Sequence, residues 1–332
     1  SRAFSRGFPV ISIHTMTSVE EKKSSYKFDV LQCAKPFRDE VSQTIVSKYS
    51  AKEQRPLLVG FLANADPAAK AYARWTKRAC EADNLNFELR EVGRAELVNK
   101  LKEAAEDPAV HGIMIYYPCF GNLPSFFGGS MDNYLRDSIP TTKDVEGLCH
   151  PYRHALYHNQ RYADEQKTKK NILPCTPLAI VKILEHLQVY DSTLPVGNRL
   201  AGKVVSIINR SEIVGHPLAA MLANDGATVY SIDIDSIFVF TRGNLEETSD
   251  TPASACLKSD VIVCGVPSKS YQLPSDHVSD NTVVINVSPF KCVDESTLLA
   301  KEKVVWVPSV GKVTVSMLER NLLRLFEQYH QK

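Results

Sequence analysis

Residues 208–217, INRSEIVGHP, join an apolar run to a segment with the composition of a helix. Gly215 would let such a turn approach a ligand closely, and the amino end of the following helix presents unpaired N–H groups to an anion. Arg210 supplies a planar guanidinium and Ser211 a hydroxyl, and both groups bind phosphate or ribose. A dinucleotide-binding fingerprint has three glycines, so this segment alone fits either a cofactor site or a plain strand-to-helix turn.

An acidic residue further along the chain favours the cofactor interpretation. Asp233 ends the next expected strand, 18 residues after Gly215, where a carboxylate can accept hydrogen bonds from an adenosine ribose. The same carboxylate would repel a 2′-phosphate, so a dinucleotide bound here should be NAD rather than NADP. Asp235 competes for this role, but Asp233 is closer to the expected end of the strand.

The overall composition is that of an ordinary globular enzyme. Of 332 residues, 44% are hydrophobic and 23% are charged, which suggests two domains or one large one. The net charge of +1 attracts neither nucleic acid nor an anionic membrane, and no apolar run approaches the roughly 20 residues that span a bilayer. The eight cysteines include no CxxC pair, so we expect reduced thiols and no metal site.

The first residues have an unusual composition. Residues 1–19 contain Arg2 and Arg6, several serines and no acidic residue, as transit peptides do. The segment is short and not clearly amphipathic, however. We therefore expect residues 1–25 to be a disordered leader of a cytoplasmic protein with Met16 as its start, and the alternative is a mitochondrial address.

The remaining sequence alternates between strand-like and helix-like segments, with folded structure expected to begin near Tyr26. Strands are expected at 56–63, 87–92, 112–118, 203–209, 228–234, 260–266, 282–287 and 304–308. Helices are expected at 67–82, 96–107 and 173–187, and residues 119–172 are expected to be irregular. This alternation predicts an α/β fold with a mainly parallel sheet.

Six stretches together resemble one family. They are 66–78 (DPAAKAYARWTKR), 112–118 (GIMIYYP), 143–148 (KDVEGL), 174–177 (PCTP), 209–229 (NRSEIVGHPLAAMLANDGATV) and 311–321 (GKVTVSMLERN). In this order, over about residues 55–325, they are similar to the methylenetetrahydrofolate dehydrogenase/cyclohydrolase proteins.

The resemblance implies a fold and an assembly. It implies two α/β domains with a folate cleft between them: a catalytic folate-binding domain over residues 26–178 and a Rossmann-type NAD-binding domain over residues 179–311. A final helix, 312–332, should pack back on the first domain. The resemblance also implies a homodimer.

The chain departs from the family's bifunctional members in one helix and two loops. Tyr72 matches a family tyrosine, but Thr76 stands where those members have a lysine that serves the cyclohydrolase reaction. Threonine has no ammonium to polarise water, and Lys77 is turned by about 100° around the helix. Tyr116 replaces a glutamine and Glu146 an aspartate. These changes resemble the monofunctional, NAD-dependent, fungal-type branch of the family.

The resemblance also implies a set of substrate residues. Tyr72, Thr76, Tyr116 and Glu146 would bind the folate, and Tyr72, Tyr116 and Cys175 would be catalytic. Without the resemblance, either tyrosine could simply pack, with Tyr117 as the alternative to Tyr116, and Glu146 could be solvated. Hydride transfer needs no thiolate, so we expect Cys175 to pack or to position its neighbours.

The cofactor residues come from four loops of the second domain. They are Arg210, Ser211, Asp233, Ile234, Gly265, Val266, Pro267, Gly311, Lys312, Val313 and Thr314. The segment that contains residues 311–314 is one residue shorter than the family pattern, so the resemblance predicts its contacts with the cofactor less well than those of the other loops.

The resemblance implies oxidation of 5,10-methylenetetrahydrofolate by NAD, without cyclohydrolase activity. No proton has to move when the hydride leaves, whereas cyclohydrolase chemistry must shuttle protons, so loss of the lysine should cost the cyclohydrolase reaction far more than the dehydrogenase reaction. One alternative is a bifunctional NADP enzyme, which Thr76 and Asp233 oppose. Others are a folate- or NAD-binding regulatory protein and another two-domain Rossmann dehydrogenase, for which no matching acid/base pair is found.

Overall fold

A computed structural model describes residues 24–331 of this chain. Most of the expected leader therefore lies outside the described residues. From Ser25 onward the chain is bonded to the rest of the molecule, because the Ser25 hydroxyl accepts a hydrogen bond of 2.8 Å from the Val304 N–H.

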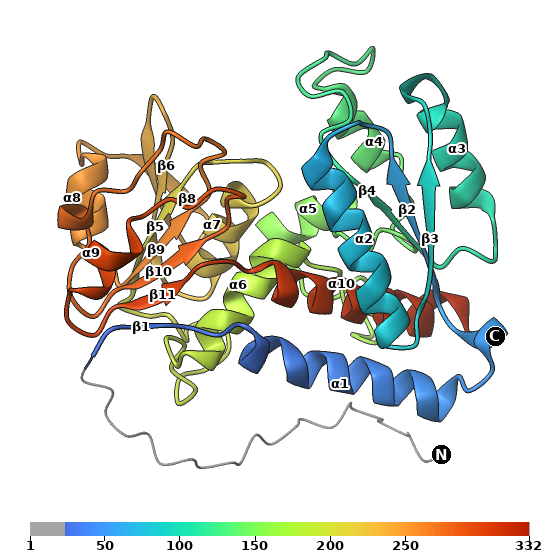
Figure 1. The fold of residues 1–332 in the computed structure, drawn as a ribbon, viewed down its shortest axis with the longest axis horizontal. Coiled ribbons are helices and arrows are strands. Elements are labelled where there is room, and N and C mark those ends of the chain that lie inside the picture. The colour runs from blue at the N-terminus through green and yellow to red at the C-terminus, as the bar shows by residue number, and fades with distance from the viewer. Residues whose placement is uncertain (1–23, 332) are drawn as a thin grey trace.

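The larger of two sheets is built mainly from the second half of the chain (Figure 1). In the described residues it has eight strands, in the order β1-β11-β10-β9-β5-β6-β7-β8. The strands are β1 (Tyr26–Lys27), β5 (Val204–Ile208), β6 (Thr228–Ile232), β7 (Ile237–Thr241), β8 (Asn244–Glu247), β9 (Val261–Cys264), β10 (Val283–Asn286) and β11 (Val305–Val307). The β6–β7 and β7–β8 pairs are antiparallel and the other pairs are parallel. β9 and β10 are buried throughout, as apolar strands of a sheet covered on both faces are.

The smaller sheet belongs to the first half of the chain. Its parallel strands are ordered β3-β2-β4, with bounds Asn86–Glu91, Leu57–Leu62 and Gly112–Ile115. β2 leads into α2 (Pro67–Ala82), whose first turn is capped by the Asp66 carboxylate and begins with a proline. α3 (Arg94–Glu106) leads to β4. Strand–helix alternation thus produces the expected α/β domain.

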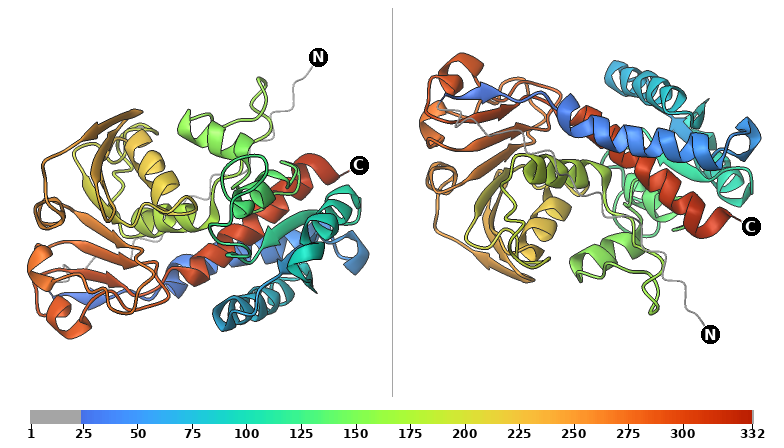
Figure 2. Two further views of the ribbon diagram at one scale, coloured as in Figure 1. Left: turned by 90° about the horizontal axis from the view of Figure 1, so that it is seen from above. Right: turned by 90° about the horizontal axis from the view of Figure 1, so that it is seen from below.

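Three long helices join the two halves of the molecule. They are α1 (Leu31–Lys48), α6 (Cys175–His186) and α10 (Gly311–Leu325), the last continuing into a π-helical turn, Phe326–His330. α10 packs against α1, α6 and α2, and Figure 2 shows α1 and α10 running side by side. One continuous apolar core extends from the first domain into the second.

Several elements were not expected from the sequence. Helix α1 contains Pro36 near its start, and the region expected to be irregular contains α4 (Met131–Asp137) and α5 (His150–Tyr157). The strands β7 and β8 form a hairpin at the edge of the large sheet. The remaining helices are α7 (Gly215–Asn224), α8 (Pro252–Leu257) and α9 (Glu295–Leu299), with 3-10 turns at Lys52–Gln54 and Ser275–His277.

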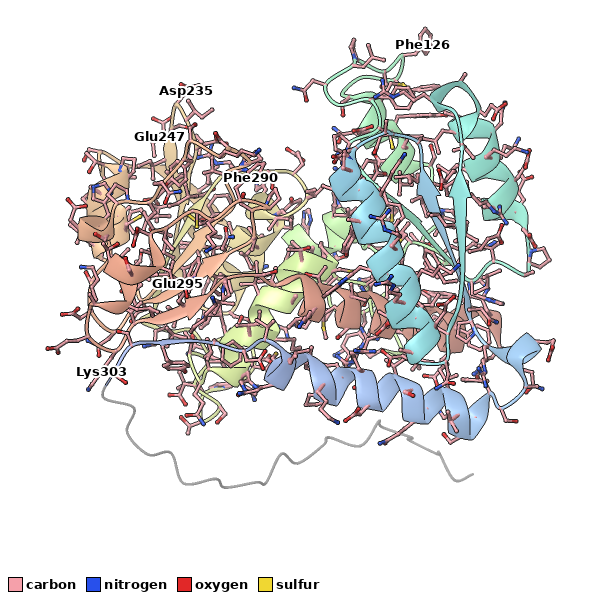
Figure 3. The ribbon with its side chains drawn as sticks, in the orientation of Figure 1. Phe126, Asp235, Glu247, Phe290, Glu295 and Lys303 are labelled. Carbon is pink, nitrogen blue, oxygen red and sulfur yellow. The ribbon has the colours of Figure 1, made fainter. Side chains whose placement is uncertain are left out.

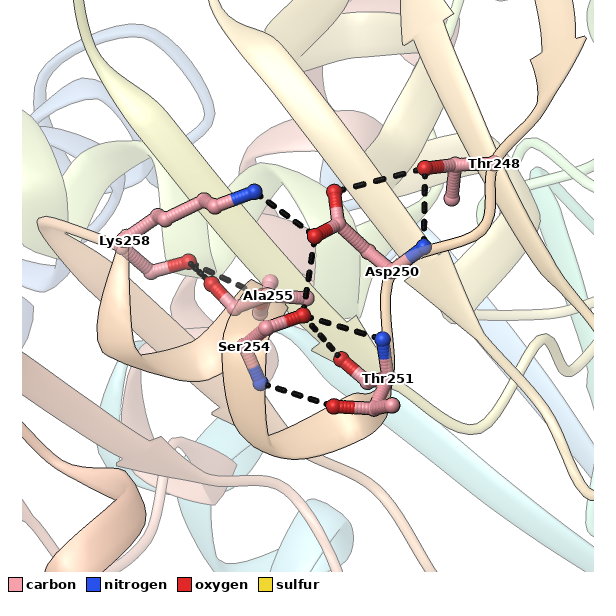
Figure 4. Close-up of polar contacts among 8 residues, drawn as sticks. Thr248, Asp250, Thr251, Ser254, Ala255 and Lys258 are labelled. Atoms are coloured by element: carbon pink, nitrogen blue, oxygen red, sulfur yellow. Dashed lines mark hydrogen bonds and ion pairs between the residues drawn. The ribbon is translucent and has the colours of Figure 1, made fainter.

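A polar network connects the hairpin to α8 (Figure 4). The Asp250 carboxylate accepts hydrogen bonds from Lys258 Nζ at 2.6 Å, Ser254 Oγ at 2.8 Å and Thr248 Oγ1 at 3.3 Å. Thr251 and Ser254 form a capping box at the helix start. The chain that returns from β8 is therefore fixed before it enters β9.

Candidate active site

The proposed substrate residues lie where β2 and β4 end. Tyr72 and Thr76 lie one turn apart on α2, and Tyr116 directly follows β4. The rings of Tyr72 and Tyr116 meet edge to face, with centroids 5.8 Å apart. Gly60 leaves room for this arrangement, because a Cβ there would lie 3.0 Å from Tyr116 Cε2.

The hydroxyl of Tyr116 is buried and has no hydrogen-bond partner among the described residues. Burial raises its pKa, an effect that nearby Thr76 opposes, so the hydroxyl carries its proton at neutral pH. The hydroxyl of Thr76 is itself committed, since it donates to the Tyr72 carbonyl at 3.0 Å. A buried phenol without a partner is suited to a polar ligand that enters the site.

Glu146 lies beside these aromatic residues. Its Oε2 accepts a hydrogen bond of 3.3 Å from the Ile115 N–H of β4, and burial raises the pKa of the neighbouring Tyr72 hydroxyl. Burial, reinforced by Asp144, raises the pKa of Glu146 to about 8. The carboxyl is therefore mainly protonated at neutral pH and can both donate and accept hydrogen bonds.

The loop that carries Glu146 is organised by Asp144. Its Oδ1 accepts the N–H groups of Glu146 and Gly147 at 3.0 Å, and its Oδ2 accepts those of Leu148 and Cys149 at 2.8 Å. Gly147 has φ +66°, and a Cβ there would lie 2.8 Å from the Leu173 carbonyl carbon. The loop is thus fixed against the segment that precedes Cys175.

Cys175 is held by two neighbours. Its thiol donates to the Val145 carbonyl at 3.2 Å, and Asn321 Nδ2 donates to its sulfur at 3.4 Å. The same Asn321 nitrogen bonds the carbonyls of Val145 and Leu173, at 2.9 and 3.1 Å. Burial raises the pKa of the Cys175 thiol, so the group is a neutral thiol, as a positioning or packing role requires.

Replacing Glu146 by glutamine should change how stability depends on pH. The pKa of Glu146 is higher in the folded chain, so its contribution is full below its unfolded pKa, near 4.5, and is lost as the pH rises toward about 8. We expect wild-type protein to lose about 3–4 kcal/mol of unfolding free energy between pH 5 and pH 8 through this group, and Glu146→Gln to lose less. Urea unfolding at both pH values measures the difference. Exposed Glu96→Gln is the control, and equal slopes for wild type and Glu146→Gln would contradict the assignment.

On the cofactor side, Asn209 joins the ends of three strands. Its backbone has φ 93°, a conformation that asparagine adopts more readily than most residues. Its N–H donates to Ile232 O at 2.9 Å, at the end of β6, and its Nδ2 donates to Gly265 O at 2.6 Å, beyond β9. Gly215 packs directly on this residue, because a Cβ at 215 would lie 2.1 Å from Asn209 O.

Arg210 and Ser211 make bonds within the protein. The Arg210 guanidinium turns toward Ser231 of β6 and Ser236 of the β6–β7 connection. Ser211 Oγ accepts the N–H of Gly215, the first residue of α7, at 3.3 Å. Both side chains are thus bonded within the protein, and their role in binding phosphate or ribose stays a prediction.

Asp233 begins the turn that follows β6. Its N–H donates to Ser236 O, and its Oδ1 accepts the N–H of Ile234, both at 2.9 Å. Ile234 is 94% exposed, and Figure 3 places Asp235 at the outer tip of this turn. Asp233 is half-buried and Asp235 exposed, so Asp233 is the better placed of the two to bind a ligand at the sheet.

The other expected cofactor residues divide into exposed and buried ones. Gly265 and Val266 are half-buried and Pro267 is exposed. Gly311 and Lys312, the first residues of α10, are also half-buried. Val313 and Thr314 are buried, and the Thr314 hydroxyl donates to Val310 O at 3.3 Å. A cofactor beside α10 would therefore meet Gly311 and Lys312 first.

The sequence had not identified four residues that position the site: Asp144, Asn321, Ser231 and Ser236. A signal existed for Asp144, since an aspartate shortly before a glycine commonly accepts the N–H groups of its own loop. No local signal exists for the others, whose partners are distant in the sequence.

Other features bear on the kind of site. In the part of the chain that the structure describes, no group of three or more His, Cys, Asp or Glu residues could hold a metal ion. All eight cysteines are buried and free. None of the described helices is both long and apolar enough to cross a membrane.

Comparisons with known proteins cover nearly the whole chain. Residues 28–146 match the family description "Tetrahydrofolate dehydrogenase/cyclohydrolase, catalytic domain", and residues 174–330 match the corresponding NAD(P)-binding domain. The chain is 49% identical to a methylenetetrahydrofolate dehydrogenase [NAD(+)] of Dictyostelium discoideum, over 90% of this chain and 94% of the relative. It is 48% identical to the protein of that name in Schizosaccharomyces pombe, over 88% and 93%. The solved NAD-dependent 5,10-methylenetetrahydrofolate dehydrogenase of Saccharomyces cerevisiae is similar with a TM-score of 0.85 and 43% identity, over 93% of this chain and all of the other.

Proposed function

Because this chain belongs to the tetrahydrofolate dehydrogenase/cyclohydrolase family, we propose that it oxidises 5,10-methylenetetrahydrofolate to 5,10-methenyltetrahydrofolate with NAD as hydride acceptor. The observation that carries the proposal is the identity of 48–49%, over nine-tenths of the chain, to enzymes named for this activity. The half-buried carboxylate of Asp233 after β6 supports NAD over NADP.

The substrate residues have the chemistry that a reduced folate requires. Tyr72 and Tyr116 offer an aromatic corner and a protonated, unpartnered hydroxyl. Glu146 can accept hydrogen bonds from the amino and ring N–H groups of a pterin, in the folate cleft that we infer between the domains. Cys175 and Asn321 hold the Glu146 loop in place. These groups orient the methylene carbon, and positioning supplies much of the rate enhancement of a hydride transfer.

The dinucleotide would be held by the loops at the carboxyl ends of β5, β6 and β9. Bound there, NAD would supply a nicotinamide ring as the hydride acceptor. The main chain at Gly215 and Gly265 is packed so closely that a Cβ would meet Asn209 O or Val287 Cγ2. Such glycines let a backbone approach a pyrophosphate. Asp233 would bind the adenosine ribose.

We propose that cyclohydrolase activity is absent. Thr76 is fully buried and its hydroxyl is bonded to the preceding helical turn, so it cannot deliver a proton. Lys77 points outward toward Glu81, at 3.9 Å, with about half of its side chain exposed. Neither position 76 nor Lys77 of α2 therefore offers an ammonium to the site.

Three further properties are proposed on the family resemblance: a homodimer, the division into a folate-binding domain (26–178) and an NAD-binding domain (179–311), and a cytoplasmic location. The pairing of β1 with β11 adds one qualification, because residues 26–27 contribute an edge strand to the cofactor domain's sheet.

Initial rates with NAD and NADP test the activity. The appearance of methenyltetrahydrofolate is followed by its absorbance, and we expect kcat/KM to be at least about tenfold higher with NAD, since an unpaired charge near a phosphate is strongly unfavourable. A second assay follows enzyme-dependent hydrolysis of methenyltetrahydrofolate, which should not exceed the buffer rate. An NADP preference or clear hydrolysis would favour the bifunctional alternative, and no product with either cofactor would favour a regulatory protein.

A further inference from the structure

Arg210 uses four of its five guanidinium N–H groups within the cofactor domain. Nε donates to Ser231 Oγ at 3.0 Å and Nη1 to Ser236 Oγ at 3.0 Å. Nη2 donates to the carbonyl oxygens of Ser231 and Ser236, at 2.7 and 3.1 Å. The guanidinium also lies over the Phe238 ring, 4.4 Å from its centroid. We name these three partners and Arg210 the arginine latch.

The arginine latch fastens the turn that carries Asp233. Ser231 belongs to β6 and is fully buried, whereas Ser236 closes the turn by accepting the Asp233 N–H through its carbonyl. None of the four hydrogen bonds of Arg210 goes to Asp233 itself. The Asp233 charge nevertheless acts on Arg210 by opposing the pKa decrease that burial causes. Arg210 is thus influenced by the Asp233 charge while its hydrogen bonds go to the two serines.

This arrangement matters for a 2′-phosphate. Such a phosphate is recognised by a cation, most effectively by an arginine with free N–H groups. The Asp233 charge acts on Arg210, yet four of the five guanidinium N–H groups are already bonded to the two serines. On the basis of the proposed NAD-dependent function, we propose that Ser231 and Ser236 withhold Arg210 from a 2′-phosphate, so that cofactor choice depends on the arginine latch as well as on Asp233.

Selection by the arginine latch and selection by Asp233 alone predict different results for a variant that lacks the Asp233 carboxylate. Removing the carboxylate would end its repulsion of a 2′-phosphate, but the guanidinium would still be held by the serines. Removing the Ser236 hydroxyl as well would break the bond of Nη1 and leave both Nη1 N–H groups for a phosphate, while Nε and Nη2 keep their bonds to Ser231 and to the Ser236 carbonyl. The two changes should therefore reinforce each other, whereas independent effects would only add.

A double-mutant cycle tests this coupling. Wild type, Asp233→Ser, Ser236→Ala and the double variant are titrated by calorimetry with ADP and with adenosine 2′,5′-bisphosphate, and their kcat/KM values are measured with NAD and NADP. Each variant's fold-gain in affinity for adenosine 2′,5′-bisphosphate is taken relative to wild type. We expect the gain of the double variant to exceed the product of the two single-variant gains by about tenfold, which is typical of one charge-assisted hydrogen bond to phosphate. Thr241→Ala, on the same strand as Phe238, is the control for loss of a hydroxyl, and thermal unfolding verifies that each variant is folded.

Arg210→Gln in the double-variant background should remove the gain. Purely additive effects in the cycle, or a gain that survives Arg210→Gln, would overturn the arginine latch. The calorimetric titrations with ADP and adenosine 2′,5′-bisphosphate do not depend on turnover of the folate substrate. A wild-type protein that binds these nucleotides but forms no methenyltetrahydrofolate would contradict the proposed function, while the cycle would still decide the role of the latch.

Discussion

Alanine at position 215 is expected to weaken NAD binding by about 100-fold or more, because overpacking at main-chain contacts forces the backbone to move. The added Cβ would lie 2.1 Å from Asn209 O and 3.1 Å from Arg210 Cα. Both atoms belong to the main chain, so no side-chain rotation relieves the contact. Asn209 cannot retreat easily either, since it is bonded to Ile232 and Gly265 at the ends of two neighbouring strands.

Relief would therefore require the turn to open and the start of α7 to move away from the proposed cofactor. Calorimetric titration with NAD measures the binding loss, and thermal unfolding measures the strain. Gly93→Ala is a matched control, because no atom lies within 4 Å of its added Cβ and its φ is −68°. Wild-type NAD affinity in Gly215→Ala would show that the turn at 208–217 is not part of the cofactor site.

This turn was among the best-determined features of the sequence. Its strand, glycine and helix follow one another within 21 residues, 204–224, so local chemistry decides the outcome. Gly226 follows α7 with φ +102°, as expected for a helix that ends in a left-handed glycine. The parallel core strands were also predictable, since buried strands are continuous apolar runs.

The hairpin β7–β8 shows why other elements were missed. Its first strand lacks a clear alternation, and all five of its residues are half-buried. The second, NLEE, is fully exposed and carries two acids, which is unusual for a strand. The sequence did contain a signal for the turn, since X-Gly pairs such as Arg242–Gly243 favour two-residue hairpins. In the structure both residues have positive φ, as this kind of turn requires.

Site-positioning contacts were less predictable than site residues. The sequence predicts Arg210 as a cofactor residue but not its partners, which lie 21 and 26 residues away. Whether Arg210 reaches these serines depends on the register of β6 and β7. Asn321 bonds Val145 across 176 residues. That contact exists only because α10 returns to the first domain. Long-range packing, rather than local propensity, sets both arrangements.

Asp144→Ala is expected to destabilise the protein by about 3–5 kcal/mol, in the range found when one partner of a buried charged network is removed. Asp144 is 1% exposed and accepts four backbone N–H groups. Alanine would leave these donors buried without partners, and each unsatisfied donor costs about 1–3 kcal/mol unless the loop rearranges. Because this loop holds Glu146 against β4, kcat/KM for the folate should fall with it.

Asp164→Ala provides the comparison, because Asp164 also accepts backbone N–H groups, from Thr168 and Lys169, but in an exposed loop. Water can satisfy those donors after the substitution, so we expect a loss of less than about 1 kcal/mol. Asp144→Asn should be intermediate, since one amide oxygen retains part of the network. Urea unfolding ranks the three variants, and an Asp144→Ala protein as stable as Asp164→Ala would mean that the four N–H groups find water and that burial does not fix the Glu146 loop.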